Sequence, residues 1–171
     1  GTDNRYLKAT DWNIVLGRSF LQHEEQSGTA VCIIGETVRQ NLFGNTNPVG
    51  EQIRLKNLSC QVIGLLEAKG ASSFGSDQDD IVLLPIKTLQ RRIIGRPDVA
   101  IIYVAAATGV STDRAMREIE ALMRERRRIG IGEDDDFNVM DMKQIASMLT
   151  GITTVLTGLL SAVAAVSLLV G

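Results

Sequence analysis

The sequence predicts an α+β fold: a mixed lobe of short strands and helices, a strand–helix–strand unit, and a long apolar C-terminal helix. Short apolar runs separated by turn residues fill the first 98 residues, and an amphipathic helix flanked by two strand-like segments follows. The last 28 residues carry no charged side chain. A chain of 171 residues has room for one ordinary domain or two small ones. We therefore divide it into residues 1–98, 99–143 and 144–171.

The first lobe is predicted from apolar runs and turn signals. Ala30–Ile34 is a continuous apolar run that predicts a buried central strand, and the segment ETVRQNLFG after it predicts a short helix between two glycines. The segments QIRLK and CQVIGLL, separated by NLS, predict a β-hairpin. A further strand is expected at Ile81–Leu84, and a short helix is expected from Pro85 to Ile94.

Residues 99–143 predict a strand–helix–strand unit. Val99–Ala107 is rich in β-branched and small apolar residues and predicts a strand. The segment STDRAMREIEALMRERRR predicts a helix capped by Ser111 or Thr112, and Phe137–Met140 predicts the returning strand. The apolar face of the helix follows the 3.6-residue period and comprises Ala115, Met116, Ile119, Leu122 and Met123.

The C-terminal segment contains no charge after Lys143. As a helix, Gln144–Gly171 would be about 42 Å long at about 1.5 Å per residue, and a bilayer core needs only about 20 residues. Residues 158–171 have no polar face, whereas helices of soluble proteins keep one. We interpret residues 144–171 as a stalk and the start of a transmembrane helix in contact with lipid. The alternative is a buried helix in a soluble core.

The sequence offers no recognisable constellation of catalytic, cofactor-binding or metal-binding residues. The 18 basic and 20 acidic residues give a net charge of -2, which argues against nucleic-acid binding. The phosphate-loop, nucleophile-elbow and zinc-protease motifs are absent. The acidic run GEDDD lacks the spacing of a calcium loop and is interpreted as a solvated turn. His23 lies in a charged loop without further ligands.

Cys32 and Cys60 both fall in apolar stretches. Small buried thiols are the expected state. A disulfide between neighbouring strands is the alternative if the compartment is oxidising.

The segment KGASSFGSDQDD, residues 69–80, predicts the longest flexible loop of the chain. Because exposed aromatic and charged residues on loops often bind partners, Phe74, Asp77 and Asp79 are candidate partner contacts. The alternative is an ordinary surface loop in which Phe74 folds back onto the core.

Several sequence blocks together resemble the extracytoplasmic core domain of MacB-type ABC transporter permeases, in the MacB/FtsX-like family. They are GTDNRYLKATDWNIVLGRSF, AVCIIGETVRQNLFGNTNPVGEQIRL, DQDDIVLLPIKTLQRRIIG and the terminal SAVAAVSLLVG. The resemblance covers essentially the whole chain. It implies that residues 1–98 form a Sabre-like lobe and that residues 99–143 form the second strand–helix–strand unit of a porter-like lobe. The first porter unit is expected before Gly1, and the tail is expected to begin the second transmembrane helix.

The resemblance implies a mechanical function in export rather than catalysis within this chain. An ABC ATPase, as a separate subunit or an upstream domain, would use ATP and Mg. The resulting motion would expel a macrolide, a peptide or a similar substrate through a periplasmic adaptor and a TolC-like outer-membrane channel. The permease would work as a homodimer in the inner membrane, with residues 1–143 on the periplasmic or extracytoplasmic side.

Three other functions are compatible with the sequence. A permease of the same superfamily could extract lipoproteins or regulate cell-wall hydrolases. A membrane-anchored sensor or binding domain would have no transport role.

Overall fold

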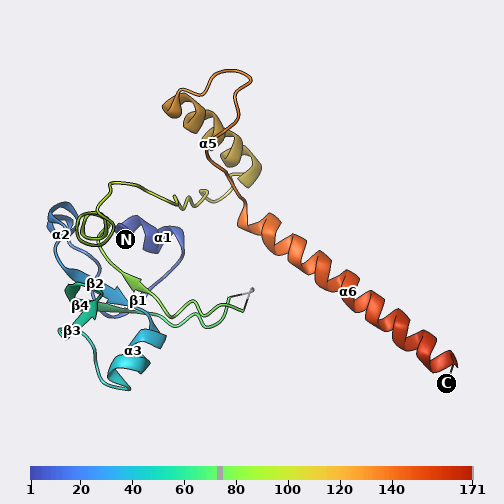
Figure 1. Cartoon of the computed structure of the whole chain (residues 1–171), viewed down its shortest axis with the longest axis horizontal. Helices are drawn as coiled ribbons and strands as arrows, with labels where there is room; N and C mark the ends of the chain where they lie inside the picture. The colour runs from blue at the N-terminus through green and yellow to red at the C-terminus, as the bar shows by residue number, and fades with distance from the viewer. Residues whose placement is uncertain (73–74, 171) are drawn as a thin grey trace. The chain divides into compact units, whose positions relative to one another are not determined.

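The computed structural model describes residues 1–72 and 75–170, without side chains at residues 143, 144, 146, 149 and 165–170. Its contacts divide the chain into two units, Gly1–Ala105 and Ala106–Gly171. The first unit is a mixed sheet with helices, and the second unit contains two helices (Figure 1). This confirms the predicted α+β class. The boundaries predicted at residues 98 and 143 stay predictions.

The elements of the first unit alternate between short helices and strands. In chain order they are α1 (Asn4–Ala9), β1 (Ile14–Gly17), α2 (Gln22–Ser27), β2 (Val31–Ile34), α3 (Glu36–Phe43), β3 (Gln52–Leu55), β4 (Leu58–Leu66), β5 (Val82–Leu83), α4 (Ile86–Leu89) and the π-helix η1 (Gln90–Ile94). The predicted central strand, the 36–44 helix and the β3–β4 hairpin are confirmed. The sequence reading missed α1 and α2, and it wrongly placed His23 in a loop, since this residue lies in α2.

The sheet is organised around β4, its longest strand. The strand order is β1-β4-β2-β5, and β3 also pairs with β4. The β2–β4 pair is parallel, whereas β1 and β3 pair with β4 and β5 pairs with β2 in antiparallel fashion. Strands β1 and β3 both bind to β4, one beyond the other along its length. The mixed sheet therefore places the end of β1 near the start of β3.

Each face of the sheet carries its own core because alternate residues of a strand point to opposite faces. Cys32 and Ile34 belong to one cluster, which also contains Val38 of α3. Val31 and Ile33 belong to the other, which also contains Leu7 of α1. All four residues of β2 are buried, which explains why its sequence is continuously apolar. Burying such side chains contributes about 1.5–3 kcal/mol each.

The second unit contains α5 (Thr112–Arg127) and α6 (Met142–Val170). Helix α5 confirms the predicted helix, with Ser111 as the N-cap and Asp113 in the first turn. Its C-terminal arginines bind the acidic segment that follows: Arg124 pairs with Asp135 and Arg127 with Asp136. The run GEDDD is therefore a turn that is tied back to α5.

The strands predicted at Val99–Ala107 and Phe137–Met140 are wrong, since neither segment forms a strand. A strand requires a neighbour to pair its backbone groups, and no described strand pairs with either segment. The apolar side chains of the first segment remain exposed: Val99, Ile101, Ile102 and Val104.

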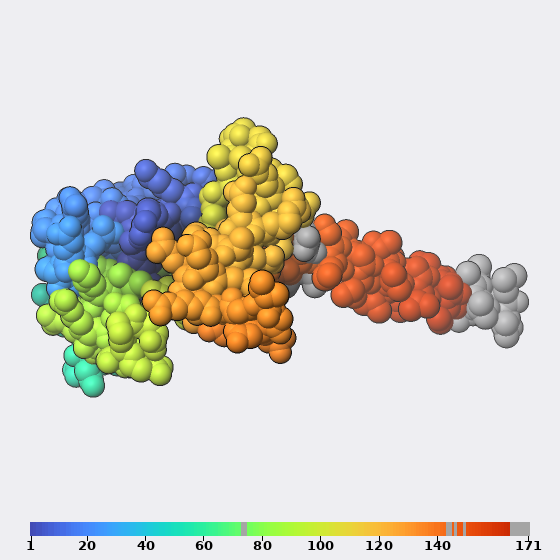
Figure 2. Space-filling view, turned by 90° about the horizontal axis from the view of Figure 1, so that it is seen from above, coloured from blue at the N-terminus to red at the C-terminus, as the bar shows by residue number. Residues whose placement is uncertain are grey.

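Helix α6 covers the segment that was expected to enter a membrane. Thr154, Thr157 and Ser161 each donate a hydroxyl hydrogen bond to the carbonyl four residues earlier. Figure 2 shows the described part of the helix as a rod of exposed side chains. Within the described residues, no helix is both long enough and apolar enough to cross a membrane. The side chains of residues 165–170, and Gly171 as a whole, belong to the predicted membrane segment but lie outside the described residues.

Candidate functional site

The candidate partner-contact loop, residues 69–80, begins just after β4 and ends just before β5. Its two described arms, 69–72 and 75–80, run side by side away from the sheet in Figure 1. Ala71 and Asp77 form an isolated antiparallel bridge, and the Ser72 N–H donates to the Ser76 carbonyl over 2.8 Å. The described parts of the loop are therefore a narrow hairpin.

Asp79 closes the base of this hairpin. Its side chain accepts hydrogen bonds from the backbone N–H of Lys69 at 2.8 Å and of Gly70 at 2.9 Å. The residue is only 5% exposed. A buried carboxylate is tolerated where hydrogen bonds replace its lost hydration, and these bonds supply them. Asp79 thus holds together the two ends of the loop.

Asp77 lies on the exposed side of the hairpin and joins it to α3. Its Oδ1 accepts from the Asp79 N–H at 2.8 Å, and its Oδ2 accepts from the Thr37 hydroxyl at 2.7 Å. The Thr37 hydroxyl and the backbone N–H groups of Asp79 and Asp80 hold the pKa of Asp77 below its ordinary value. The carboxylate is therefore ionised at neutral pH and strengthens both bonds.

The structure brings together two of the three predicted partner-contact residues, Asp77 and Asp79. Phe74 lies outside the described residues. The sequence reading missed Thr37, which stands forty residues from Asp77 in the chain. Thr37 lies in the first turn of α3, after the N-cap Gly35, and its position in the sequence gives no signal of this distant contact. That these residues contact a partner stays a prediction.

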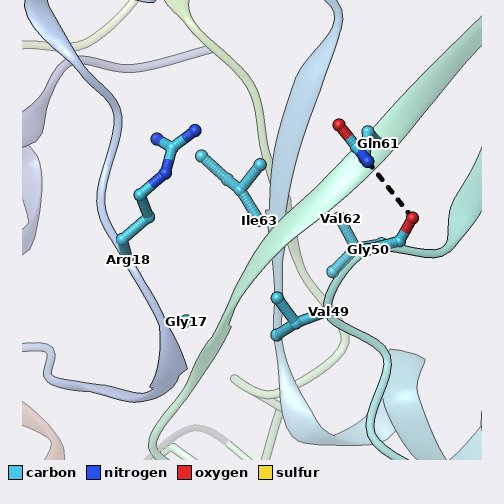
Figure 3. A pocket seen from close by; sticks show the side chains of 7 residues that line it. All are labelled: Gly17, Arg18, Val49, Gly50, Gln61, Val62 and Ile63. Atoms are coloured by element: carbon cyan, nitrogen blue, oxygen red, sulfur yellow. Dashed lines mark hydrogen bonds between the residues drawn. The ribbon is translucent and has the colours of Figure 1, made fainter.

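A shallow groove lies on the sheet where β1 ends and β3 begins (Figure 3). Its volume is about 390 Å³, and it is lined by Gly17, Arg18, Val49, Gly50, Gln61, Val62 and Ile63. The Gln61 amide donates to the Gly50 carbonyl at its rim. The Arg18 guanidinium is held by both oxygens of Glu24. The groove offers a mostly apolar surface with a fixed cation at its edge.

Cys32 and Cys60 are free thiols on the paired strands β2 and β4, buried in the same cluster. Val62, and not Cys60, lies opposite Cys32 in the register, so the two cysteines are diagonal neighbours. The neighbouring Cys60 thiol and burial raise the pKa of Cys32. The predicted buried thiols are confirmed.

The described residues contain no group of three or more His, Cys, Asp or Glu side chains placed to hold a metal ion. In particular, the acidic residues Asp135 and Asp136 bind arginines.

Two solved structures share the fold. The periplasmic region of MacB from Actinobacillus actinomycetemcomitans superposes with a TM-score of 0.65 at 18% identity, over 86% of this chain and 63% of that one. The extracellular domain of the ABC-type transporter YknZ from Gram-positive bacteria superposes with a TM-score of 0.64 at 20% identity. The superposition covers 82% of this chain and 68% of that one. At these sequence identities, both likenesses show a shared fold.

Residues 1–122 match the family described as MacB-like periplasmic core domain. The chain therefore belongs to this family, and it is a periplasmic core domain of a MacB-type ABC transporter permease.

Curated relatives extend this result. A macrolide export ATP-binding/permease protein MacB from Chlorobium luteolum is 40% identical over 149 residues, or 87% of this chain and 22% of the relative. The protein of the same name from Marinobacter nauticus is 38% identical over 172 residues, which is 99% of this chain and 26% of the relative. The chain thus spans about a quarter of the length of these relatives.

Proposed function

We propose that this chain is the extracytoplasmic part of an export permease that transmits ATP-driven motion to its substrate. The observation that carries the proposal is the family match over residues 1–122. The names of the relatives, which combine macrolide export with an ATP-binding/permease protein, support a macrolide or similar substrate. ATP and Mg would bind to an ATPase domain or subunit outside this chain, which itself would hold no cofactor and carry out no catalysis.

The proposed partners follow from the same assignment. The permease would act as a homodimer in the inner membrane, with residues 1–143 outside the cytoplasm and the tail in contact with lipid. A periplasmic adaptor would bind the outer domain and connect it to a TolC-like channel. Within the domain, we assign adaptor contact to the loop 69–80, since its described arms, residues 69–72 and 75–80, pair with each other and extend from the sheet.

An export assay tests the proposal. The full-length permease, expressed with its ATPase and adaptor in a macrolide-sensitive host without its own exporter, should raise the drug concentration that the host tolerates. An ATPase variant that binds but does not hydrolyse ATP is the control and should give no protection. Equal tolerance with the active and the inactive ATPase would contradict export.

Replacing Phe74 and Asp77 together tests the adaptor assignment. Both side chains are expected at the partner surface, so the double variant F74A/D77A should lower adaptor-dependent drug tolerance without unfolding the domain. Unchanged tolerance at equal protein level would remove the assignment.

The orientation can be tested by cysteine labelling. Asn57 lies in the exposed β3–β4 turn, and both native cysteines are buried. In intact cells, Asn57→Cys should react with a maleimide that does not cross the inner membrane. Labelling only after lysis would place the domain in the cytoplasm.

A further inference from the structure

The turn Gly130–Glu133 follows helix α5 and carries an isoleucine at its corner. The Glu133 N–H donates to the Gly130 carbonyl at 3.3 Å, and Gly132 has φ +87°. This geometry fits a type II β-turn, which requires a positive φ at the third of its four residues and therefore favours glycine there. Ile131 is the second residue of the turn, and its side chain is fully exposed.

Helix α5 holds both ends of this turn through one arginine. The Arg124 guanidinium donates to the Gly130 carbonyl at 2.7 Å and to the Glu133 carbonyl at 3.2 Å. It also pairs with the Asp135 carboxylate. In return, the Glu133 carboxylate accepts the Gly130 N–H at 2.7 Å. The base of the turn is therefore closed by backbone and side-chain bonds together, and these bonds restrain the position of the corner residue.

An isoleucine is an unusual residue for this corner. Turn positions are mostly Gly, Pro, Asn, Asp or Ser, because these residues favour the required dihedral angles or bond to the nearby backbone. An isoleucine does neither, and among the described residues Ile131 belongs to neither core cluster. Single exposed apolar residues are common on protein surfaces, but this one stands on a backbone that a hydrogen-bond network holds in place. Local preferences are broken in this way mainly at functional sites.

The charges beside Ile131 indicate what kind of surface it fits. Glu133 and Asp134 follow the corner and are exposed, whereas the next two aspartates are paired with arginines of α5. The C-terminal side of the turn is therefore negative. Membrane-surface anchors combine several apolar side chains with basic ones, and a single isoleucine next to two carboxylates does not match that pattern. The turn matches a protein surface that offers a small apolar pocket and a cation.

We propose that Ile131 is a preformed anchor that enters an apolar pocket on a folded protein partner. The partner places a Lys or Arg at the rim of this pocket, facing Glu133 and Asp134. Arg124 is then a positioning residue, since it holds the turn. Because the turn is restrained before binding, association orders less of the chain and costs less free energy. The inference rests on the proposed function, in which a periplasmic adaptor binds this chain, and it adds a contact separate from the loop 69–80.

Binding of the purified adaptor to the full-length permease in nanodiscs tests the anchor. Ile131→Ser should weaken binding about 10- to 100-fold, the range expected for one buried aliphatic side chain. Ile131→Val removes one methylene group and should weaken binding only about 4-fold. Leu42→Ser changes another exposed apolar residue, on α3, and is the matched control that should bind as the unaltered permease does. Because Ile131 is fully exposed, its replacement should leave the midpoint of thermal unfolding unchanged.

A double-mutant cycle tests the role of Arg124. Arg124→Gln should speed deuterium exchange of the Gly130 and Glu133 amides and should weaken adaptor binding. In the Ile131→Ser background, the same change should have no further effect on the affinity, because Arg124 acts through Ile131. An equal loss of affinity in both backgrounds would overturn the positioning role.

The outcomes separate the anchor from the proposed function. If the adaptor does not bind the unaltered permease, both are wrong. Equal adaptor affinity of Ile131→Ser and the unaltered permease would overturn the anchor alone. If Ile131→Ser leaves adaptor binding unchanged but lowers the dimer fraction in mass photometry, Ile131 contacts a second copy and the proposed partner is wrong. Unchanged adaptor binding with weaker attachment to phosphatidylglycerol vesicles would overturn the protein partner in favour of lipid.

Discussion

The Arg18 guanidinium holds both carboxylate oxygens of Glu24 at 2.8 Å. Glu24 is buried at the start of α2 and also accepts the Leu21 N–H at 2.8 Å. The Glu24 carboxylate therefore has two roles: it caps the N-terminus of α2 and it forms the ion pair with Arg18. The hydrogen bonds from Arg18 lower the pKa of Glu24 despite the opposing effect of burial.

Arg18→Met should destabilise the domain, because it leaves the buried Glu24 carboxylate without its cation. Breaking a buried pair costs about 3–5 kcal/mol, but the Arg18 side chain is 44% exposed, so we expect about 2 kcal/mol. Urea unfolding of both proteins at pH 7 measures the difference.

The pH dependence provides the control for this pair. Glu24 has a depressed pKa in the folded state, so the stabilisation is complete above the ordinary glutamate pKa and is lost as the pH falls through the folded value. The difference between Arg18→Met and the unaltered protein should shrink below about pH 4. A difference that is constant from pH 7 to pH 3 would show that the pair is not its source.

Glu36 should titrate well below an ordinary glutamate. Hydrogen bonds from Arg39 and Gln40 lower its pKa to about 2. Its contribution to stability is thus present above the ordinary pKa of about 4.3 and is lost as the pH falls towards 2. NMR titration of the Glu36 side-chain carbon measures this value directly.

Arg39→Ala should raise the pKa of Glu36 towards the ordinary range. It should also destabilise the folded domain by about 0.5–1 kcal/mol, as expected for a partly exposed pair. An unchanged pKa in this variant would contradict the assignment.

Gly17→Ala should lower the free energy of unfolding more than Gly95→Ala does, although the two glycines have similar positive φ angles. Gly17 has φ +79°, and an added β-carbon would lie 2.1 Å from the Ile63 carbonyl oxygen. Gly95 has φ +75° with no atom within 4 Å of the same position. Gly95→Ala should therefore cost about 1–2 kcal/mol from backbone strain alone. Gly17→Ala should cost about 1–3 kcal/mol more because of overpacking. Equal midpoints of thermal unfolding would show that β1 can move away from β4.

Cys32 and Cys60 should resist thiol reagents in the folded protein and react after denaturation. Both are buried, and their diagonal positions on β2 and β4 do not favour the short Cα separation of a disulfide. Two free thiols per chain are expected by mass spectrometry after alkylation in denaturant. A mass lower by two hydrogens, with no alkylation until a reductant is added, would establish the disulfide alternative.

The sequence predicted elements whose signal is local. The run Val31–Ile34 is buried on both faces, and this produces a continuous apolar pattern that can be recognised without a structure. Helix α3 lies between two glycines, which mark its ends in the sequence. The hairpin of β3 and β4 is also local, since the two strands follow one another with a short turn.

Features that depend on distant partners could not be predicted in this way. The segment Val99–Ala107 has the composition of a strand, but composition does not supply a neighbour to pair with it. The bond between Thr37 and Asp77 depends on the fold bringing α3 beside the loop. The acidic character of Asp79 suggested exposure, whereas its backbone hydrogen bonds allow it to be buried. Helix α2 is short and polar, so its sequence contains no apolar residues repeating at the helical period that would have predicted it.

The pairing of β2 also has a consequence for the order of folding. The hairpin of β3 and β4 can close as soon as residue 66 has been synthesised, but β2 must then join β4 across the intervening helix. Its other edge is covered only when Leu83 arrives. During export of the chain across a membrane, an apolar strand edge would therefore stay open until the segment at Val82–Leu83 emerges. A chaperone that recognises extended apolar chain should bind stalled chains ending before this segment and release those extending well beyond it.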